Sequence, residues 1–368
     1  MKWAGGVMDG DSIRREVERF DPEVPLEEAS TPPSTWYTEP AFYELERERV
    51  FSANWIVAAN AHDLREPGQY VAGEMAGERY LLVRGEDGAL RAFSNLCRHR
   101  ATGVAEGCGR AERFVCPYHG WTYGLDGRLL SAPELGGVKG FDRARSGLVP
   151  LAACEWGPLV FIGLAGGERS LPEDLAALSA RLGTAGFSKL RFAARRTYDL
   201  SCNWKVFVDN YLDGGYHVPA LHKGLAAELD MESYRTEVFE RFSIQSSGGA
   251  PGAGRVGERT LYAWIYPNLM INRYGSIMDT NWVVPAGPDR TRVIIDFFFE
   301  EPEGAGGRAF IEKCIAASHA IQLEDVAISE SVHKGLASRF FDRARYSVKR
   351  QMGEHHFHRL LRADLARA

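Results

Sequence analysis

The sequence predicts an α+β protein, with a small all-β domain followed by a larger domain built on a mainly antiparallel sheet. Two observations support this fold class. Between about residues 55 and 165, short segments of β-forming residues recur between Gly, Asp and Pro residues. Beyond about residue 200, strand-like segments are followed by one long helical segment, so strands and helices are segregated along the chain.

The length and composition limit the class of protein further. A chain of 368 residues exceeds one ordinary hydrophobic core, so we expect separate domains. We place an N-terminal arm and helix at residues 1–48, the all-β domain at 49–165 and the α+β domain at 166–368. A net charge of −5 without a basic run argues against nucleic-acid binding. The sequence shows neither a long apolar stretch nor the pattern of a signal peptide, so we expect a cytoplasmic protein with no membrane partner.

The elements of the first domain are predicted from local patterns. A Pro-rich stretch precedes a helix-compatible segment, AFYELERERVFSANW. A connecting helix is expected at SLPEDLAALSARLGT, with Ser170 as N-cap and Pro172 and Glu173 in the first turn. The strands between these helices are predicted at WIVAAN, QYVAGEM, RYLLVRG, LRAFSN, RFVCPY, WTYGL and PLVFIGL.

The second domain mixes the two types of element. We expect a helix at about 203–217 and a long helix at about 307–337. The strands are predicted at about 239–246, 259–273, 277–285 and 291–300.

A first set of possible metal ligands lies in the all-β domain. Cys97 and His99 form a C-x-H pair, and Cys116 and His119 form a C-x-x-H pair. Each pair offers one thiolate and one imidazole, whereas zinc fingers usually pair Cys with Cys and His with His. A [2Fe–2S] cluster with two Cys on one iron and two His on the other requires both kinds of ligand from each loop. A structural zinc site is the alternative.

A second set lies in the expected helix at 203–217 and just after it. His217 and His222 are five residues apart, and Pro219 between them should break the helix and let His222 turn back. Asp209, Asp213 and His217 recur every four residues and should share one helix face. Two imidazoles and one carboxylate form the facial triad of non-haem Fe(II) oxygenases.

The carboxylate of this triad is expected from the long helix, where Glu324 and Asp325 are adjacent. Asp325 shares an apolar stripe with Ile321, Ile328 and Val332, and a carboxylate on a core-facing stripe is costly unless it is paired or bound to metal. We therefore predict Asp325 as the third ligand.

These motifs resemble those of a known family. CRHRA and CPYHGWTYGLDG are similar to the Rieske motifs of ring-hydroxylating oxygenases, and NWKVFVDNYLDGGYHVPALH with QLEDVAISE is similar to their iron-binding segments. The resemblance implies a Rieske [2Fe–2S] domain, a helix-grip (START-like) catalytic domain, mononuclear Fe(II) and O₂ as co-substrate. Tyr118 stands where respiratory Rieske proteins carry an additional cysteine. Cys108 is assigned no role.

The resemblance also implies a carboxylate relay between subunits. Many family members carry Asp or Glu three residues before the first iron histidine, where it bridges to the cluster of a neighbouring subunit. This chain has Gly214 there, so we expect Asp213 to be the relay and Asp209 to be the fallback. Orientation of His217 is the alternative role for Asp213. Transfer between subunits implies a ring-like homotrimer.

Three further segments are DNYLDGGYHVPALH, LYAWIYPNLMINRYGSIMDTNWVVP and RYSVKRQMGEHHFHRLL. They resemble segments of choline monooxygenase and its bacterial relatives, and the similarity runs from about residue 38 to the end of the chain. The resemblance implies hydroxylation of a carbon next to nitrogen in a quaternary ammonium compound, with choline giving betaine aldehyde (hydrate). A quaternary ammonium is recognised by aromatic faces. The expected substrate residues are Tyr262, Trp264, Tyr266, Trp282 and Asp279, and Tyr274 lies in the same aromatic segment.

Two alternatives remain at this point. The chain could demethylate or hydroxylate another substrate, such as glycine betaine, a carnitine-like compound or an aromatic acid. It could also be a Rieske electron-transfer protein without oxygenase activity, although such a protein has no use for the second metal site. No flavin, nicotinamide or plant-type ferredoxin motif is apparent in the sequence, so electrons should come from a separate ferredoxin or flavin reductase.

Overall fold

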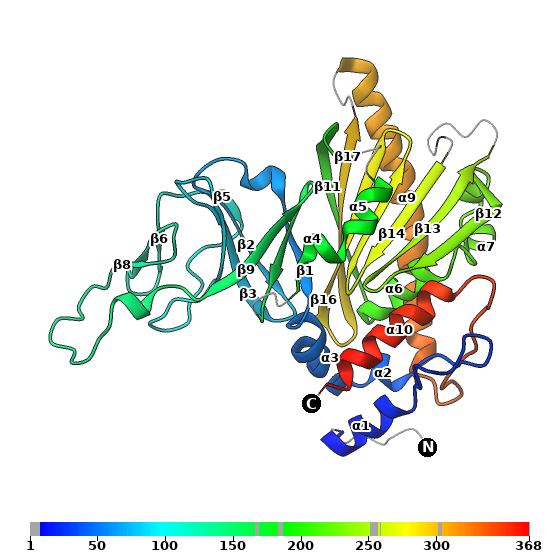
Figure 1. The fold of residues 1–368 in the computed structure, drawn as a ribbon, viewed down its shortest axis with the longest axis horizontal. Coiled ribbons are helices and arrows are strands. Elements are labelled where there is room, and N and C mark those ends of the chain that lie inside the picture. The colour runs from blue at the N-terminus through cyan, green and yellow to red at the C-terminus, as the bar shows by residue number, and fades with distance from the viewer. Residues whose placement is uncertain are drawn as a thin grey trace. The chain divides into compact units, whose positions relative to one another are not determined.

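The structure is a computed structural model that describes residues 8–165, 169–182, 187–250, 257, 259–300 and 304–367. The chain forms two compact units (Figure 1). One unit comprises residues 51–173. The other combines the chain up to Val50 with the chain from Asp174 onwards. The N-terminal arm, which the sequence analysis treated as a separate part, is therefore packed with the larger unit. Within the described residues, no helix is both long and apolar enough to cross a membrane.

The smaller unit is built on antiparallel strands, as the sequence predicts. Its seven-stranded sheet has the order β1-β10-β9-β4-β3-β2-β5. The strands are β1 (Trp55–Asn60), β2 (Gln69–Met75), β3 (Glu78–Arg84), β4 (Leu90–Ser94), β5 (Cys108–Arg110), β9 (Pro150–Trp156) and β10 (Leu159–Gly163). β5 and β9 were not predicted. β5 is a three-residue edge strand, too short to show an alternating pattern.

A second, three-stranded sheet joins β6 (Phe114–Val115), β7 (Thr122–Tyr123) and β8 (Leu129–Ser131). Its apolar residues, including Trp121, Tyr123 and Leu129, pack with Leu81 and Phe93 of the larger sheet in one core. Cys97 and Cys116 belong to the same buried cluster. The loops that carry the first ligand set are therefore held by a common hydrophobic core.

The larger unit contains a seven-stranded antiparallel sheet of order β11-β17-β16-β15-β14-β13-β12. The strands are β11 (Leu190–Leu200), β12 (Leu229–Val238), β13 (Phe242–Gly249), β14 (Arg259–Ile265), β15 (Leu269–Tyr274), β16 (Ile277–Gly287) and β17 (Arg290–Glu300). The strand expected at 259–273 is two strands joined by a tight connection that contains Pro267. β11 and β12 were not predicted, because partly exposed residues interrupt their apolar pattern.

Three helices are central to this unit. α6 (Trp204–Leu212) lies against β16 and against the long helix α9 (Gly304–Leu336), and α10 (Met352–Leu365) lies against β12 and α6 (Figure 1). α6 ends at Leu212, five residues earlier than expected. Gly214 and Gly215 follow with φ of +71° and +69°, values that glycine adopts readily and that end the helix.

The remaining helices are short. α7 (Val218–Leu221) and α8 (Lys223–Ala226) follow the Gly turn, and Pro219 lies in the first turn of α7 instead of breaking a helix. α4 (Leu171–Asp174) and α5 (Ala176–Leu182) occupy the expected connecting helix, whose last two positions, 183 and 184, lie outside the described residues. The N-terminal arm contains α1 (Gly10–Glu18), α2 (Thr35–Thr38) and α3 (Pro40–Glu46), followed by a π-helical turn.

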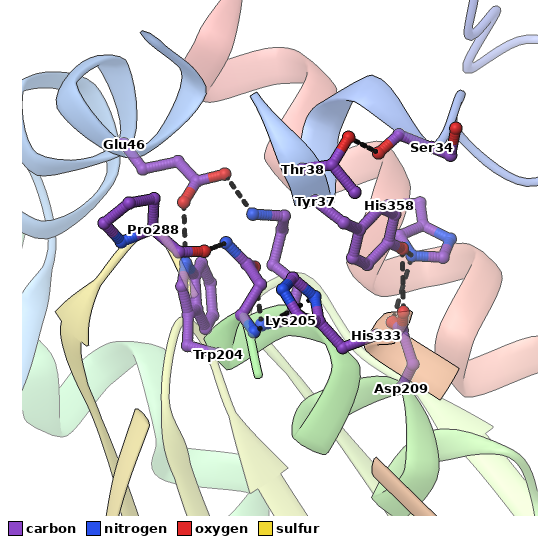
Figure 2. Close-up of polar contacts among 11 residues, drawn as sticks. Ser34, Tyr37, Thr38, Glu46, Trp204, Lys205, Asp209, Pro288, His333 and His358 are labelled. Atoms are coloured by element: carbon purple, nitrogen blue, oxygen red, sulfur yellow. Dashed lines mark hydrogen bonds and ion pairs between the residues drawn. The ribbon is translucent and has the colours of Figure 1, made fainter. Parts of the chain in front are cut away.

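The arm is attached to α6 by a buried ion pair (Figure 2). Lys205 Nζ lies 2.5 Å from Glu46 Oε1, and Trp204 Nε1 donates to Glu46 Oε2 at 2.7 Å. Both charged side chains are fully buried. Burial raises the pKa of Glu46 and lowers the pKa of Lys205, so the contact offsets a large desolvation cost.

Candidate metal centres and substrate pocket

The two loops of the first ligand set bring Cys97, His99, Cys116 and His119 together. The rings of His99 and His119 have centroids 4.5 Å apart, and Trp121 stacks on His99 at 5.1 Å with an interplanar angle of 4°. Cys97 and Cys116 are buried and their side chains are within hydrogen-bonding reach of each other. The two imidazoles thus form one pair and the two thiols another, which are the pairs that the two irons of a Rieske cluster require.

The protonation chemistry of these groups also suits a metal cluster. Burial acts to raise the pKa of the Cys97 thiol, but hydrogen bonds from Tyr123 O–H and the His99 backbone N–H lower it below its ordinary value. Burial and the neighbouring His119 lower the pKa of His99, which favours the neutral ring. His99 Nδ1 is buried without a hydrogen-bond partner. A buried ring nitrogen with a free lone pair is the kind of donor that an iron cluster uses.

The second ligand set also converges. The candidate ligand atoms of His217, His222 and Asp325 all lie within 4.8 Å of one another. His217 is the N-cap residue of α7, His222 lies between α7 and α8, and Asp325 comes from the middle of α9. Asn210 donates from Nδ2 to Asp325 Oδ1 at 2.8 Å, which fixes the carboxylate.

Each histidine of this set is oriented by a carboxylate. His217 Nδ1 lies 2.7 Å from Asp213 Oδ2, and His222 Nδ1 lies 2.6 Å from Glu324 Oε2. Carboxylates accept, so each ring can donate from Nδ1–H and direct Nε2 toward a metal. His222 Nε2 lies 3.0 Å from Asp325 Oδ1, and these are the two atoms that would share the metal. Burial opposes a charge on His222, but Asp325 and Glu324 raise its pKa, which shows that the site attracts positive charge. These residues fit a mononuclear iron.

The predicted helix faces of Asp209, Asp213 and Asp325 differ from those in the structure. Asp213 is the C-cap of α6, and its carboxylate also accepts from the backbone N–H groups of Tyr216 and His217. Asp209 is bonded to Tyr37 and His358, not to His217. The stripe beside Asp325 does not face the core, because the side chains of Ile328 and Val332 are 37% and 45% exposed in the single chain. Asp325 nevertheless lies with both histidines, whereas Glu324 bonds to the far side of His222.

The triad opens into a cavity of about 140 Å³ between α6, α9 and the sheet. Its walls include His217, His222, Asp325 and the predicted substrate residues Tyr262 and Asp279. Asp279 is almost completely buried; its carboxylate accepts from Asn272 Nδ2 and from Tyr274 O–H, both at 2.6 Å. A buried carboxylate among aromatic rings is suited to an organic cation.

Three further tyrosines line the cavity: Tyr211, Tyr234 and Tyr274. The hydroxyl of Tyr211 donates to Asn272 Oδ1 at 2.9 Å and that of Tyr234 donates to Gln245 Oε1 at 3.1 Å, so both rings are fixed. Burial raises the pKa of both phenols well above the ordinary value, which keeps them neutral. Tyr274 was part of the aromatic segment recognised in the sequence. Tyr211 and Tyr234 were missed, because they come from α6 and from the unpredicted β12.

The other predicted substrate residues lie elsewhere. Trp264 shares a strand face with Tyr262, but the ring of Phe357 on α10 packs against it with centroids 5.2 Å apart. Tyr266 donates its hydroxyl to Asp364 of the same helix at 2.7 Å. Trp282 alternates with Asp279 and Asn281, which puts it on the opposite face, where it packs against Arg195. α10, which the sequence analysis did not assign, therefore covers one end of the aromatic wall.

Comparison with known proteins agrees with this geometry. Residues 54–142 match the model of the Rieske [2Fe-2S] domain, and residues 187–366 match that of the ring hydroxylating alpha subunit (catalytic domain). The chain therefore belongs to the Rieske non-haem iron oxygenases, and it is a Rieske-type monooxygenase of the group that contains choline monooxygenase. It uses a [2Fe–2S] cluster, a mononuclear iron and O₂, and it needs an external source of electrons and a small-molecule substrate.

The relatives define this group. The chain is 43% identical over 370 residues to chloroplastic choline monooxygenase of Arabidopsis thaliana, covering 96% of this chain and 87% of the relative. It is 32% identical over 324 residues to the carnitine monooxygenase oxygenase subunit of Escherichia coli K12, covering 85% and 86%. The crystal structure of the quaternary ammonium Rieske monooxygenase CntA with an inhibitor superposes with a TM-score of 0.83 at 29% identity, covering 94% and 96%. The predicted family, fold class and cofactors are thereby confirmed.

Proposed function

We propose that this monooxygenase hydroxylates a quaternary ammonium compound, with choline as the first candidate. One observation carries the proposal. The cavity that opens onto His217, His222 and Asp325 is lined by four tyrosines and by the buried carboxylate of Asp279. A trimethylammonium group has no N–H to donate, so aromatic faces and a carboxylate are the groups that recognise it. The names of the relatives point to the same substrate class.

The proposal assigns roles to the two converging sets. Cys97, His99, Cys116 and His119 hold the cluster in the unit expected at residues 49–165. His217, His222 and Asp325 hold the iron in the part expected at 166–368. When bound, the cluster supplies electrons and the iron activates O₂ for insertion into a C–H bond. Asp213 and Glu324 keep both imidazoles in the ligating tautomer, and Asn210 holds the Asp325 carboxylate in place.

The product depends on which carbon the pocket presents to the iron. Insertion at the hydroxyl-bearing carbon of choline gives a geminal diol, which is betaine aldehyde hydrate. Insertion at the methylene carbon bonded to nitrogen gives an unstable carbinol, which loses a proton and breaks down to trimethylamine and glycolaldehyde. Asp279 and the tyrosines hold the ammonium group. The distance from this group to the iron site therefore decides which carbon of choline is oxidised. We favour the aldehyde hydrate, as in the choline monooxygenases that the chain resembles.

The electron route is proposed to cross between protomers of a homotrimer. Asp213, already bonded to His217, is the proposed relay, with Asp209 as the fallback. Support comes from large side chains that are exposed in the single chain. Tyr118 lies beside His119 and is 62% exposed, and Phe341, which lines the same cavity as Asp213, is 37% exposed. We propose a separate ferredoxin or flavin reductase as donor and a cytoplasmic location, which cell fractionation would test.

Reconstitution tests the function directly. The purified protein, supplied with electrons by a generic reductase, is given choline, glycine betaine, carnitine and 3,3-dimethylbutan-1-ol, the neutral isostere of choline. We expect O₂ uptake matched by betaine aldehyde with choline, and Asp279→Asn should raise KM for choline while leaving KM for the neutral isostere unchanged. If no quaternary ammonium compound yields product, the substrate class is wrong. Trimethylamine as the main product would show that oxygen is inserted at the carbon bonded to nitrogen and not at the hydroxyl-bearing carbon.

A further inference from the structure

A second polar cluster lies next to the candidate iron site, on the side of α6 away from the substrate cavity. Asp209 accepts from Tyr37 O–H at 2.7 Å and from His358 Nε2 at 3.0 Å (Figure 2). Tyr346 O–H lies 2.6 Å from His358 Nδ1. The hydrogen bonds are all satisfied when His358 carries its proton on Nε2, Tyr346 donates to Nδ1 and Asp209 is ionised. The network therefore holds a carboxylate anion inside the protein.

Glu354 is buried beside this anion. The candidate ligand atoms of Asp209, Glu354 and His358 lie within 4.8 Å of one another, and Glu354 Oε2 accepts from Gln351 Nε2 at 2.7 Å. Burial, followed by the charges of Asp209 and Asp213, raises the pKa of Glu354 well above its ordinary value. This shift favours the protonated carboxyl, which lies close to the Asp209 carboxylate.

Asp209, Asp213 and Glu354 line one cavity of about 240 Å³, which we call the acidic chamber. Its volume accommodates several water molecules. The chamber reaches the iron site at two points, because Asp213 is bonded to His217 and Asn210 is bonded to Asp325. Asn210 lines both the acidic chamber and the substrate cavity, so it is the wall between them.

The proposed reaction consumes protons. Inserting one oxygen atom of O₂ into a C–H bond and releasing the other as water takes two electrons and two protons. The cavity tyrosines Tyr211 and Tyr234 are poor proton sources, since burial raises their pKa values well above the ordinary value for tyrosine. The acidic chamber offers a carboxyl with a raised pKa, in a cavity that ends at Asn210 beside the same site.

We propose that Glu354 is the internal proton donor for oxygen reduction and that water in the acidic chamber carries the proton to the Asn210 wall. The inference rests on the proposed iron site. In each transfer the Glu354 O–H bond breaks, a chamber water accepts the proton and passes another on, and Glu354 is reprotonated from solvent. No electron moves through this chain, because the electrons come from the external donor. Asp209, held by Tyr37 and His358, is the fixed anion that keeps the carboxyl neutral between turnovers.

Several other groups set the electrostatic environment of Glu354 and would shape any pH profile. They come from every element packed around it: Asp209, Asp213 and Lys205 of α6, Tyr37 of α2, Tyr346 and Arg350 of the segment before α10, and His355 and His358 of α10 itself. The part of α9 that lines the chamber contributes Ile328, Ser329 and Val332, which do not titrate.

The test uses the reconstituted enzyme and three readouts: product formed per O₂ consumed, the solvent deuterium isotope effect in a single turnover, and the pH profile. Glu354→Gln keeps a hydrogen-bonding side chain but cannot release a proton. We expect normal cluster and iron content, release of H₂O₂ in place of product, and product formation slowed about 10²-fold. The wild-type rate should fall as pH rises through the pKa of Glu354, and this limb should vanish in the variant. Glu354→Asp should restore part of the rate.

The matched control is Asp364→Asn, because Asp364 is another fully buried carboxyl of α10 that bonds to Tyr266 and does not line the chamber. It should keep wild-type coupling. If Glu354→Gln loses iron, infrared difference spectra of the wild type replace the activity test. They must show the band of a protonated carboxyl, and this band must shift in Glu354→Asp. Wild-type coupling, isotope effect and pH limb in Glu354→Gln would overturn the inference. An inactive wild type would instead count against the proposed function.

Discussion

The backbone carbonyl oxygen of Arg350 lies 2.0 Å from the point that a Cβ atom on Gly214 would occupy. No side chain fits there, and the φ of +71° also favours glycine. Gly214 is the position at which the family resemblance predicts a relay carboxylate. The nearest carboxylate, Asp213, contacts both the backbone N–H and Nδ1 of His217. The close approach of the segment before α10 therefore explains why the carboxylate stands one residue earlier in this chain.

Restoring the family residue should harm this protein. Gly214→Asp would push the Arg350 segment away and strain the turn that carries His217, at a cost of roughly 1–3 kcal/mol for the backbone conformation alone. We expect loss of iron with the cluster spectrum intact, measured by metal analysis. The control is Gly224→Ala, because the added methyl group meets open space in α8. Full iron and full activity in Gly214→Asp would contradict this account.

Asp213→Asn tests the relay. The two backbone N–H groups, of Tyr216 and His217, donate to different oxygens of Asp213, so the single amide oxygen can keep one of these bonds. We therefore expect a weakened turn that still holds both metals. Loss of the charge next to His217 should slow reoxidation of the reduced cluster at least about tenfold in a single turnover, followed by stopped-flow absorbance. Asp230→Asn is the control, because Asp230 on β12 also accepts from a backbone N–H, that of Glu232. Reoxidation at the wild-type rate would leave Asp213 with an orienting role only.

Glu324 should tune iron affinity without being a ligand. Removing its contact with His222 Nδ1 frees the ring to rotate or to change tautomer, so Glu324→Ala should weaken Fe(II) binding about 10–100-fold. Glu324→Gln should be milder. Asp325→Ala should abolish binding, and Co(II) spectra should show an unchanged coordination number in the Glu324 variants. If Glu324 variants lose the metal and Asp325→Ala keeps it, the ligand assignment is reversed.

The buried pair between Lys205 and Glu46 should dominate attachment of the arm. Lys205→Met leaves Glu46 as an unpaired buried carboxyl and should lower the free energy of unfolding by about 3–5 kcal/mol. Lys205→Met combined with Glu46→Gln should recover most of this loss, because glutamine is neutral and still accepts from Trp204 Nε1. Denaturant titration of the three proteins measures the difference. A loss below about 1 kcal/mol in the single variant would rule out this role.

Two histidines of α10 should make the protein sensitive to acid. Burial lowers the pKa of His355 and of His356 to about 4, whereas an unfolded histidine titrates near 6.5. The unfolded chain therefore binds more protons between these values, and the stabilisation, complete above about pH 6.5, is lost as the pH falls toward 4. The raised pKa of Glu354 acts in the opposite direction, with stabilisation lost as the pH rises. His355→Gln and His356→Gln should each flatten the fall in Tm between pH 7 and 5; an unchanged slope would contradict the burial argument.

The sequence alone was sufficient for the local chemistry. The spacing of Cys97, His99, Cys116 and His119 predicts one converging set, because each pair lies within a single short loop whose geometry is local. The strand β1 was predicted at its observed bounds for the same reason, since its apolar run needs no distant partner to be recognised. The long helix was predicted within a few residues, at 307–337 against the observed Gly304–Leu336.

Tertiary structure decided everything that depends on contacts between distant segments. The substrate cavity combines α6, α9 and six strands, so Tyr211 and Tyr234 carried no signal. Trp264 and Tyr266 are covered by α10, a helix nearly a hundred residues downstream. Asp325 was predicted as the third iron ligand because it shares an apolar stripe, and that stripe is in fact exposed. Its position on α9 nevertheless brings it to His217 and His222. The carboxylate before the first histidine is Asp213 and not residue 214, because the carbonyl of Arg350 occupies the space that a side chain would need.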